Sequence, residues 1–314
     1  MRMNIYQEIL KERGFITALA PMEGVTNSVF RSVISEIGKP DLFFTEFLNV
    51  EGFCSKGRDK VIQRLDFTPT EQPVVVQLWG NVPEYYAKTI EYVKGLHPAG
   101  IDINMGCSVR DVLSSGRGSA LINDKVLAKE IIAAVKESSG DLPVSVKTRI
   151  GYEKIDLENW IGSLLEQGLS MLTVHGRLAK EGYSTPARWN EIAKCVTLRN
   201  TVAPDTLILG NGDVKSMNQL EDYVKLYKVD GVMIGRYILN DPWIFSGREE
   251  ISKEERIMIL RKHMEIFKSY DQEENLFDSQ KKYIKAYINN FEGAGDLRME
   301  LMRSKDVKGL LSLL

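Results

Sequence analysis

The stretch VSVKTRIGYEKIDLENWIGSLLEQGLSMLTVHGR (residues 144–177) shows most clearly how this chain folds. Two short runs rich in Val, Thr, Leu and Ile, residues 144–150 and 171–177, enclose a segment with apolar residues at helical spacing. That segment ends at Gly168, and glycine commonly ends helices. A strand, a helix and a second strand in this order are typical of two parallel strands joined by a helix.

Similar apolar runs recur along the chain on both sides of this unit, and segments of helical periodicity separate most of them. The eight runs cover residues 15–22, 41–47, 74–80, 101–107, 144–150, 171–177, 206–213 and 231–236. Eight strands alternating with helices predict an α/β fold with a parallel sheet closed into a (β/α)8 TIM barrel. The later sequence shows helical patterns without a convincing strand. We therefore expect a barrel over residues 1–245 and a small helical domain over residues 246–314.

Composition and charge limit the classes of function. The chain has 314 residues, 43% hydrophobic and 27% charged, with a formal net charge of −2. A nucleic-acid site would therefore need a local basic surface. The three cysteines are far apart and form no cluster with histidine, so we expect no metal, no disulfide framework and a reducing, cytoplasmic compartment. We recognise neither a signal peptide nor a run of about 18 apolar residues, so we expect no membrane association.

Polar residues gather at the carboxyl ends of the predicted strands, where barrel enzymes place their active sites. Because side chains alternate along a strand, Asp102 shares one face with Asn104, and Lys147 shares another with Arg149. Further polar residues at these ends are Gln77, His175, Arg177, Asn211, Asp213 and Arg236. Chance or solubility alone would scatter such residues, so the pattern predicts an active site at this rim.

Two features of this rim have more than one interpretation. The turns after the last two predicted strands contain Gly212 and Gly235. Barrels commonly bind phosphate at such turns, but ordinary strand-to-helix turns use glycine too. Lys147 fits a cation in the active site, a Schiff-base nucleophile or a solvated strand end. The residues alone leave these alternatives open.

Cys107 ends a predicted strand and precedes a loop rich in glycine and serine. Most cysteines in soluble proteins are inert and buried, and we interpret Cys54 and Cys195 in this way. A thiol at a strand end can instead exchange a proton with a bound substrate or act as a nucleophile. The sequence near Cys107 contains no histidine that would decide between these two roles.

Eight motifs in order give the chain a family resemblance. They are LAPMEGVTNSVFR (19–31), TEF (45–47), VQLWG (76–80), DINMGC (102–107), VSVKTRIGY (144–152), VHGR (174–177), GNGD (210–213) and GVMIGR (231–236). In this order and spacing, over about residues 15–245, the chain resembles the tRNA-dihydrouridine synthases. The resemblance implies an FMN-containing barrel that reduces the C5–C6 bond of selected tRNA uridines, with NADPH recharging the flavin. It is closest to the branch that acts on uridine 16 of the D-loop, and we expect a monomer.

The resemblance implies a role for each candidate residue. Hydride would pass from flavin N5 to uracil C6, and Cys107 would donate the proton to C5. The implied cofactor-binding residues are Pro21, Met22, Glu23, Gln77, Lys147, His175, Asn211, Gly212, Asp213, Gly235 and Arg236. The implied substrate or tRNA contacts are Asn49, Asn104, Arg149, Arg177, Tyr183, Ser184, Lys282 and Tyr287, with Asn104 as the amide that binds uracil.

The chain departs from the family pattern at two positions, and two other functions are alternatives to this interpretation. Ser108 follows Cys107 where the family usually has proline, which predicts a looser loop, and Asn27 replaces a commoner aspartate. An FMN barrel acting on a small molecule, similar to dihydroorotate dehydrogenase, is one alternative. A tRNA binder that has lost catalysis is the other, and only Ser108 favours it. From Lys281 onward, seven Lys and Arg accompany four Asp and Glu, which suits RNA phosphates but equally a solvated helix face.

Overall fold

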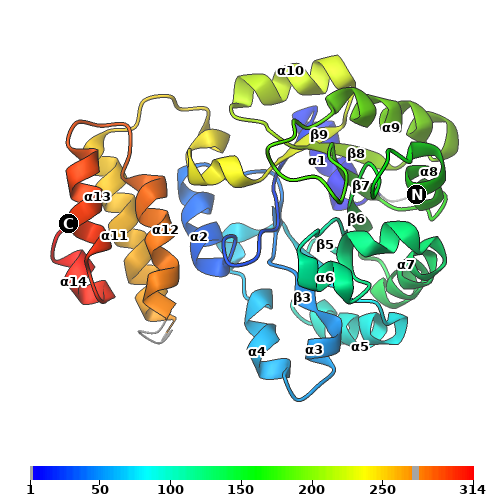
Figure 1. Ribbon diagram of the computed structural model, residues 1–314, viewed down its shortest axis with the longest axis horizontal. Coiled ribbons are helices and arrows are strands. Elements are labelled where there is room, and N and C mark those ends of the chain that lie inside the picture. The colour runs from blue at the N-terminus through cyan, green and yellow to red at the C-terminus, as the bar shows by residue number, and fades with distance from the viewer. Residues whose placement is uncertain (1–2, 271–275) are drawn as a thin grey trace.

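A barrel of parallel strands forms the larger part of the molecule, and C-terminal helices pack beside it (Figure 1). The computed structural model describes residues 3–270 and 276–314. Its strands are β1 (Ile16–Leu19), β2 (Phe43–Phe44), β3 (Leu48–Asn49), β4 (Val74–Trp79), β5 (Gly100–Met105), β6 (Val144–Arg149), β7 (Met171–His175), β8 (Leu207–Asn211) and β9 (Gly231–Ile234). Hydrogen-bonded neighbours follow the order β1-β9-β8-β7-β6-β5-β4-β2, and β3 also pairs with β4.

The sheet closes on itself between its first and second strands. Ala18 in β1 pairs in parallel with Leu42, which lies just before β2. The Leu19 N–H donates to the Leu42 carbonyl at 3.1 Å, and the Leu42 N–H donates to the Thr17 carbonyl at 3.0 Å. The other strand pairs are parallel as well. The prediction of a (β/α)8 barrel is therefore confirmed.

The second predicted strand, residues 41–47, is interrupted in the structure. Thr45 turns its hydroxyl toward β4, where it accepts a hydrogen bond from the Gln77 N–H at 3.1 Å. The next residue, Glu46, leaves the ladder and accepts a hydrogen bond from the Gly24 N–H. Since β2 and β3 both pair with β4, nine strands occupy the eight positions of the barrel.

Helices surround the barrel and close one of its ends. They are α1 (Ile5–Arg13), α2 (Ser28–Ile37), α3 (Val50–Phe53), α4 (Arg58–Ile62), α5 (Pro83–Lys94), α6 (Arg110–Ser114), α7 (Lys125–Ser139), α8 (Gly162–Leu165), α9 (Trp189–Val202) and α10 (Met217–Tyr227). The helical segment expected between the strands at residues 144–150 and 171–177 begins with a π-helical turn, Leu157–Ile161, and continues as α8. Tyr6 of α1 is fully buried with interior residues such as Ile16 and Phe44, and its ring reaches Gly100 at the start of β5. The amino end of the barrel is therefore filled, which leaves the carboxyl ends of the strands for a site.

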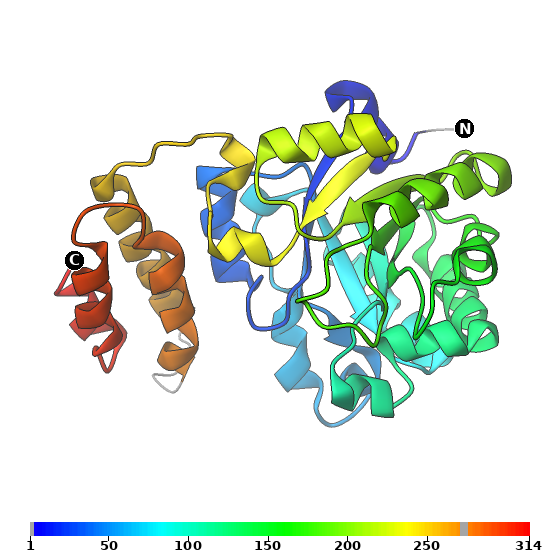
Figure 2. The ribbon, with the colours of Figure 1, turned by 45° about the horizontal axis from the view of Figure 1, so that its top comes forward.

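The chain continues into α11 (Lys253–Ser269), α12 (Phe277–Tyr287), α13 (Ala294–Met302) and α14 (Val307–Leu311), which form a group at one side of the barrel (Figures 1 and 2). Helices α11 and α12 contact each other, and α11 packs on α2. The rings of Phe30 on α2 and Tyr283 on α12 stack with centroids 4.9 Å apart, which adds a contact between these two helices. None of the helices within residues 3–270 and 276–314 combines the length and the hydrophobicity that a membrane span requires.

Candidate active site

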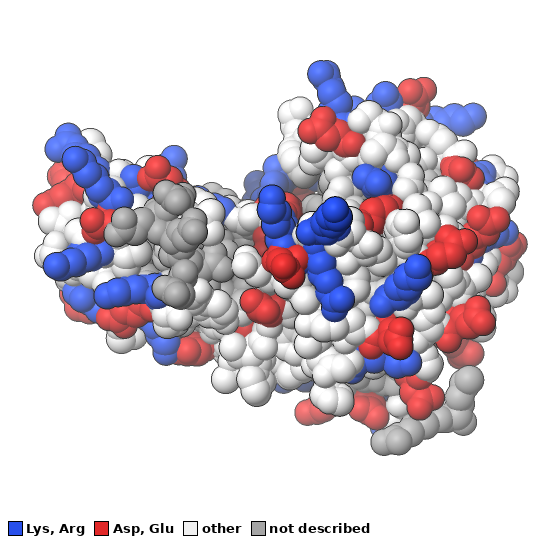
Figure 3. Space-filling model, turned by 90° about the horizontal axis from the view of Figure 1, so that it is seen from below, with Lys and Arg blue, Asp and Glu red and all other residues white. Residues whose placement is uncertain are grey.

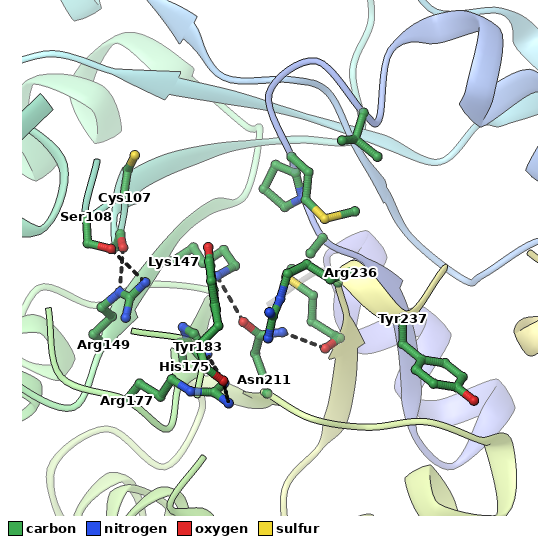
Figure 4. A pocket seen from close by; sticks show the side chains of 18 of the residues that line it. Cys107, Ser108, Lys147, Arg149, His175, Arg177, Tyr183, Asn211, Arg236 and Tyr237 are labelled. Atoms are coloured by element: carbon green, nitrogen blue, oxygen red, sulfur yellow. Dashed lines mark hydrogen bonds between the residues drawn. The ribbon is translucent and has the colours of Figure 1, made fainter. Parts of the chain in front are cut away.

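A cavity of about 540 Å³ opens at the carboxyl ends of the barrel strands (Figure 4). Strand ends and the loops that follow them line it, as the strand-end rule predicts for barrels. The predicted site residues that line it are Pro21, Met22, Glu23, Asn104, Cys107, Lys147, Arg149, His175, Arg177, Tyr183, Asn211, Gly212, Asp213, Gly235 and Arg236. The tertiary structure therefore brings most of the predicted residues to a single cavity.

The floor of the cavity carries a buried cation. Lys147 projects from β6 and donates to Oδ1 of Asn211 on β8 at 3.1 Å. Nδ2 of Asn211 donates to the Met233 carbonyl at 2.7 Å, which fixes the side of the amide that faces the lysine. Burial, together with the charge of Arg149, lowers the pKa of Lys147 to about 8. Lys147 therefore keeps its charge at neutral pH and places it where an anionic ligand atom can approach.

His175 at the end of β7 is neutral. Burial and the surrounding cations hold its pKa well below the ordinary value of 6.5. Its Nε2 lies 3.0 Å from Nη1 of Arg177. Because a guanidinium only donates hydrogen bonds, Nε2 is the acceptor and the ring proton sits on Nδ1. His175 therefore presents one N–H donor and adds no charge to the cavity.

Cys107 stands on the wall formed by the loop after β5. Oδ1 of Asn104 accepts hydrogen bonds from the N–H groups of Gly106 at 3.1 Å and Cys107 at 2.9 Å. The Cys107 carbonyl accepts from the backbone N–H and the hydroxyl of Ser119. Burial raises the pKa of the Cys107 thiol, and hydrogen bonding and nearby cations offset this only in part. The side chain is therefore a protonated thiol at neutral pH, suited to donating a proton rather than to nucleophilic attack.

Arg149 ties the Cys107 loop to the barrel. Its Nε donates to the Gly106 carbonyl at 2.7 Å, its Nη1 to the Leu178 carbonyl at 2.9 Å and its Nη2 to the Ser108 hydroxyl at 3.0 Å. The side chain is nearly fully buried. The geometry thus favours a role for Arg149 in positioning the loop. Ser108 accepts one of these hydrogen bonds through its hydroxyl, which the proline usual at this position does not have.

Arg177, just after the neighbouring strand β7, has a similar function. Its Nη2 reaches both carboxylate oxygens of Asp213 at 2.6 Å and the Tyr183 carbonyl at 3.2 Å. Its Nε donates to the Thr185 carbonyl, and its Nη1 donates to the ring of His175. Its side chain is 1% exposed. The Arg177 and Arg149 guanidinium groups are thus engaged by protein partners, which favours positioning over direct substrate contact for both. Arg236, in contrast, is half-exposed and lies over the Tyr183 ring at 3.7 Å.

Two predicted residues lie away from the cavity surface for reasons of packing. Gln77 is fully buried beneath the cavity and bonds to Asp102 and Asn104. Tyr287 is also fully buried: its hydroxyl pairs with Nδ1 of His263 at 3.1 Å, and its ring packs edge-on against Trp243. The structure thus gives Tyr287 a role in the helix core and does not place it at the surface expected for an RNA contact.

Three further predicted residues lie outside the cavity lining. Asn49 accepts from the Gly52 N–H and caps α3. Ser184 is exposed on the loop that also carries Tyr183. Nζ of Lys282 donates to the Gly24 carbonyl and therefore holds a barrel loop, while its side chain stays partly accessible. None of these three residues lines the cavity, and their positions are compatible with contact to a large substrate.

Sequence reasoning missed several residues of the cavity. Phe47 and Val25 add apolar surface, and Lys215, Tyr237 and Asn240 add polar groups from the loops after β8 and β9. The strand-end rule could have found Lys215 and Tyr237, because both closely follow the predicted glycine turns. Phe47 closes the TEF motif but lies in the interrupted second strand, so alternation along that strand could not place it. Among the described residues, no group of three or more His, Cys, Asp or Glu could hold a metal ion.

The fold and this cavity define a (β/α)8-barrel enzyme with ionisable groups at the carboxyl ends of its strands. The family model described as "Dihydrouridine synthase (Dus)" matches residues 18–314, and the chain belongs to this family. A "Probable tRNA-dihydrouridine synthase" of Staphylococcus aureus (strain COL) is 41% identical over 319 residues, covering 100% of this chain and 95% of the relative. A "Probable tRNA-dihydrouridine synthase 2" of Bacillus subtilis (strain 168) is 41% identical over 318 residues, covering 100% and 96%.

Solved structures support the fold alone. "Morphinone reductase" aligns with a TM-score of 0.51 and 11% identity, covering 74% of this chain and 84% of its own chain. At this identity, the likeness confirms the barrel architecture, and the site rests on the residues of this chain.

Proposed function

We propose that this protein is a tRNA-dihydrouridine synthase that uses FMN and NADPH to reduce the C5–C6 bond of a D-loop uridine. Membership of the family over residues 18–314 and the names of the bacterial relatives support this reaction. The observation that carries the proposal is one cavity with a protonated thiol, Cys107, on its wall and a buried cation, Lys147, on its floor.

The residues of the cavity fit a flavin phosphate cofactor. A Cβ added at Gly235 would lie 3.7 Å from Ala20 Cβ and 3.9 Å from Met22 Sδ, both of which line the cavity. Glycine therefore leaves open space at the end of β9 where a ligand can reach the backbone. Arg236 and Lys215 provide charge near this turn, and a phosphate is favoured by such groups. Lys147, His175 and Asn211 offer polar contacts to a ring on the cavity floor.

The chemistry that a bound flavin would supply is hydride transfer to C6 of uracil, after its own reduction by NADPH. The protein must then deliver a proton to C5. Cys107 holds that proton on Sγ, since burial keeps the thiol protonated. Lys147 supplies a fixed positive charge that stabilises developing negative charge in a site shielded from water. Asn104 retains one free N–H for a ligand, because its other donor and its oxygen are engaged by the protein.

For the tRNA, we propose a path from the cavity to the C-terminal helices. A second cavity of about 450 Å³ shares Asn240 with the first and is lined by Lys282, Lys285 and Arg298. Figure 3 shows Lys and Arg side chains on both sides of the hollow between the barrel and these helices. Local cations of this kind suit a phosphate backbone in a protein with a net charge of only −2.

The finer parts of the proposal concern the organisation of the protein and its target. The barrel, residues 1–245, and the helical region, residues 246–314, act as two domains of a monomer on one tRNA. Tyr183 and Ser184 are exposed beside the cavity mouth and supply RNA contacts, and Asn49 lies on the same barrel. The target is uridine 16, and the resemblance of the motifs at strands one and two supports this position.

The decisive test is Cys107→Ala assayed with purified protein, NADPH and unmodified tRNA. We expect flavin absorbance and tRNA affinity to persist while dihydrouridine formation falls on the order of a hundredfold or more, the usual effect of losing a general acid. Cys54→Ala is the matched control, because that cysteine is exposed and does not line the cavity. Full turnover by Cys107→Ala would reject the acid role.

The target position is tested by mapping dihydrouridine across total tRNA in cells with and without this gene. Loss at position 16 alone would support the proposal in full. Loss at another D-loop position would support the proposed reaction but overturn uridine 16 as its target. Retention of every dihydrouridine, combined with purified protein that reduces no tRNA, would reject the proposed function.

A further inference from the structure

A buried carboxylate inside the barrel has no part in the chemistry proposed above. Asp102 on β5 is fully buried. Its Oδ1 accepts from the Ser145 hydroxyl at 2.6 Å and its Oδ2 from Nε2 of Gln77 at 2.6 Å, and both donors are neutral. Burying a carboxylate costs several kcal/mol unless it is well paired, and an apolar side chain could fill the same space. A network retained at such a cost suggests a positioning role.

The hydrogen bonds from Asp102 continue to the Cys107 loop. Oε1 of Gln77 accepts from Nδ2 of Asn104 at 2.9 Å. Oδ1 of Asn104 then accepts the N–H groups of Gly106 at 3.1 Å and Cys107 at 2.9 Å. The strand register supports this path, because Gln77 on β4 lies directly opposite Asp102 on β5.

The hydrogen bonds along this path are consistent with only one orientation of each amide side chain. The backbone N–H groups of Gly106 and Cys107 can only donate, so Asn104 must turn its oxygen toward them and its amino group toward Gln77. Gln77 must then turn its oxygen to Asn104 and its amino group to residue 102. An ionised carboxylate at that position only accepts, so it allows Gln77 no other orientation.

We propose that Asp102 is a positioning residue for Cys107: through Gln77 and Asn104 it fixes the backbone that holds the thiol against the cavity. The value of this positioning rests on the proposed function, in which Cys107 is the proton donor. Arg149 and Ser119 hold the carbonyl groups of the same loop. The hydrogen bonds that begin at Asp102 therefore hold the N–H groups of this loop, whereas Arg149 and Ser119 hold its carbonyl groups.

The three free cysteines provide a test that needs no tRNA. Cys54 is exposed, Cys107 is intermediate and Cys195 is buried. Iodoacetamide labelling, followed peptide by peptide by mass spectrometry, reports the loop through Cys107 and global unfolding through Cys195. Cys54 measures reagent activity in the same sample. Labelling of Cys107 therefore tests the positioning path independently of whether the protein reduces uridine.

Three variants distinguish hydrogen-bond direction from charge and from general packing. Asp102→Leu removes the acceptor, and we expect Cys107 to label several-fold faster while Cys195 stays protected. Asp102→Asn should label like the wild type, because its amide can offer oxygen to Gln77 and its amino group to Ser145. Gln77→Met removes the middle link without altering Asp102, and should raise Cys107 labelling as Asp102→Leu does.

The labelling results distinguish the proposed path from the alternatives. Unchanged Cys107 labelling in a folded Asp102→Leu or Gln77→Met protein would overturn the proposal. Faster labelling in Asp102→Asn equal to that in Asp102→Leu would also overturn it, since charge would then matter instead of direction. If Asp102→Leu exposes Cys195, the protein is unfolding, and Gln77→Met then decides. The proposed function is judged separately by the dihydrouridine assay of Cys107→Ala.

Discussion

At the residue scale, one lysine on the floor of the candidate site carries a charge that changes close to neutral pH. Lys147 is buried with a cationic neighbour, Arg149, and its pKa is lowered to about 8. His175 close by is neutral for the same reasons. The charge on Lys147 is therefore present below pH 8 and is lost as the pH rises above it. Binding of a flavin ring that accepts a charge-assisted hydrogen bond from Lys147 at the cavity floor should follow this titration.

We predict that the affinity for FMN weakens as the pH rises from about 7 to 9.5, with a midpoint near the Lys147 pKa of about 8. Flavin fluorescence titrations at constant ionic strength measure this directly. Lys147→Met should bind FMN on the order of tenfold more weakly at pH 7, which is about 1.4 kcal/mol. It should also lose the pH dependence. An affinity that stays flat to pH 9.5 in the wild type would remove Lys147 from the cofactor site.

At the element scale, helix α12 holds a loop of the barrel mouth. The Tyr283 hydroxyl donates to the Val25 carbonyl, and Lys282 donates to the Gly24 carbonyl. From the other side, the Glu46 carboxylate accepts from the Gly24 N–H. The loop between β1 and α2, which carries the cavity residue Met22, is thus held between the barrel and the C-terminal helices. Contacts of a distant sequence segment therefore shape the cavity.

Tyr283→Phe should loosen this loop without disturbing the helix core. The ring keeps its stack on Phe30, and only the hydrogen bond to the Val25 carbonyl is lost. We expect a loss of about 1 kcal/mol in unfolding free energy and a several-fold weaker affinity for FMN. Tyr92→Phe is the control, because that exposed ring lies away from the cavity. Equal FMN affinity in Tyr283→Phe and wild type would show that α12 does not shape the cavity.

At the scale of the whole molecule, a buried histidine couples the stability of the helical region to pH. His263 is fully buried among Phe30, Tyr283 and Tyr287, with neutral hydrogen-bond partners in Tyr287 and Gln280. Burial lowers its pKa from 6.5 to about 4. Between these values the unfolded chain binds a proton that the folded protein does not bind. Stability therefore falls as the pH falls from 6.5 to 4.

We predict that His263 contributes about 3 kcal/mol to this acid destabilisation, from its two pKa values. Urea unfolding at pH 7, 5.5 and 4 measures the slope. His263→Gln keeps a polar side chain that does not titrate, so the drop in unfolding free energy should be smaller by about this amount. His97→Asn is the control, since His97 is exposed and asparagine tolerates its left-handed backbone, φ 54°. Identical slopes in wild type and His263→Gln would contradict the prediction.

The sequence determined the barrel and much of the rim of the cavity. Local apolar runs and helical spacing mark the alternation of strands and helices, and parallel strands place their carboxyl ends together. Cys107, Lys147 and the glycine turns could therefore be assigned to one site. Family motifs added the chemistry of these residues, which spacing alone left open for Cys107 and Lys147.

Only the tertiary structure decided which side chains remain available to a ligand. Arg149 and Arg177 occur at strand ends, yet folding brings loop carbonyls to them from distant segments and engages their donors. The helical pattern around Tyr287 is compatible with a position on the surface or in the core. Packing against Trp243 places it in the core. The path from Asp102 to Cys107 likewise depends on register between neighbouring strands. Sequence patterns describe one element at a time, whereas burial and hydrogen-bond partners arise from contacts between elements.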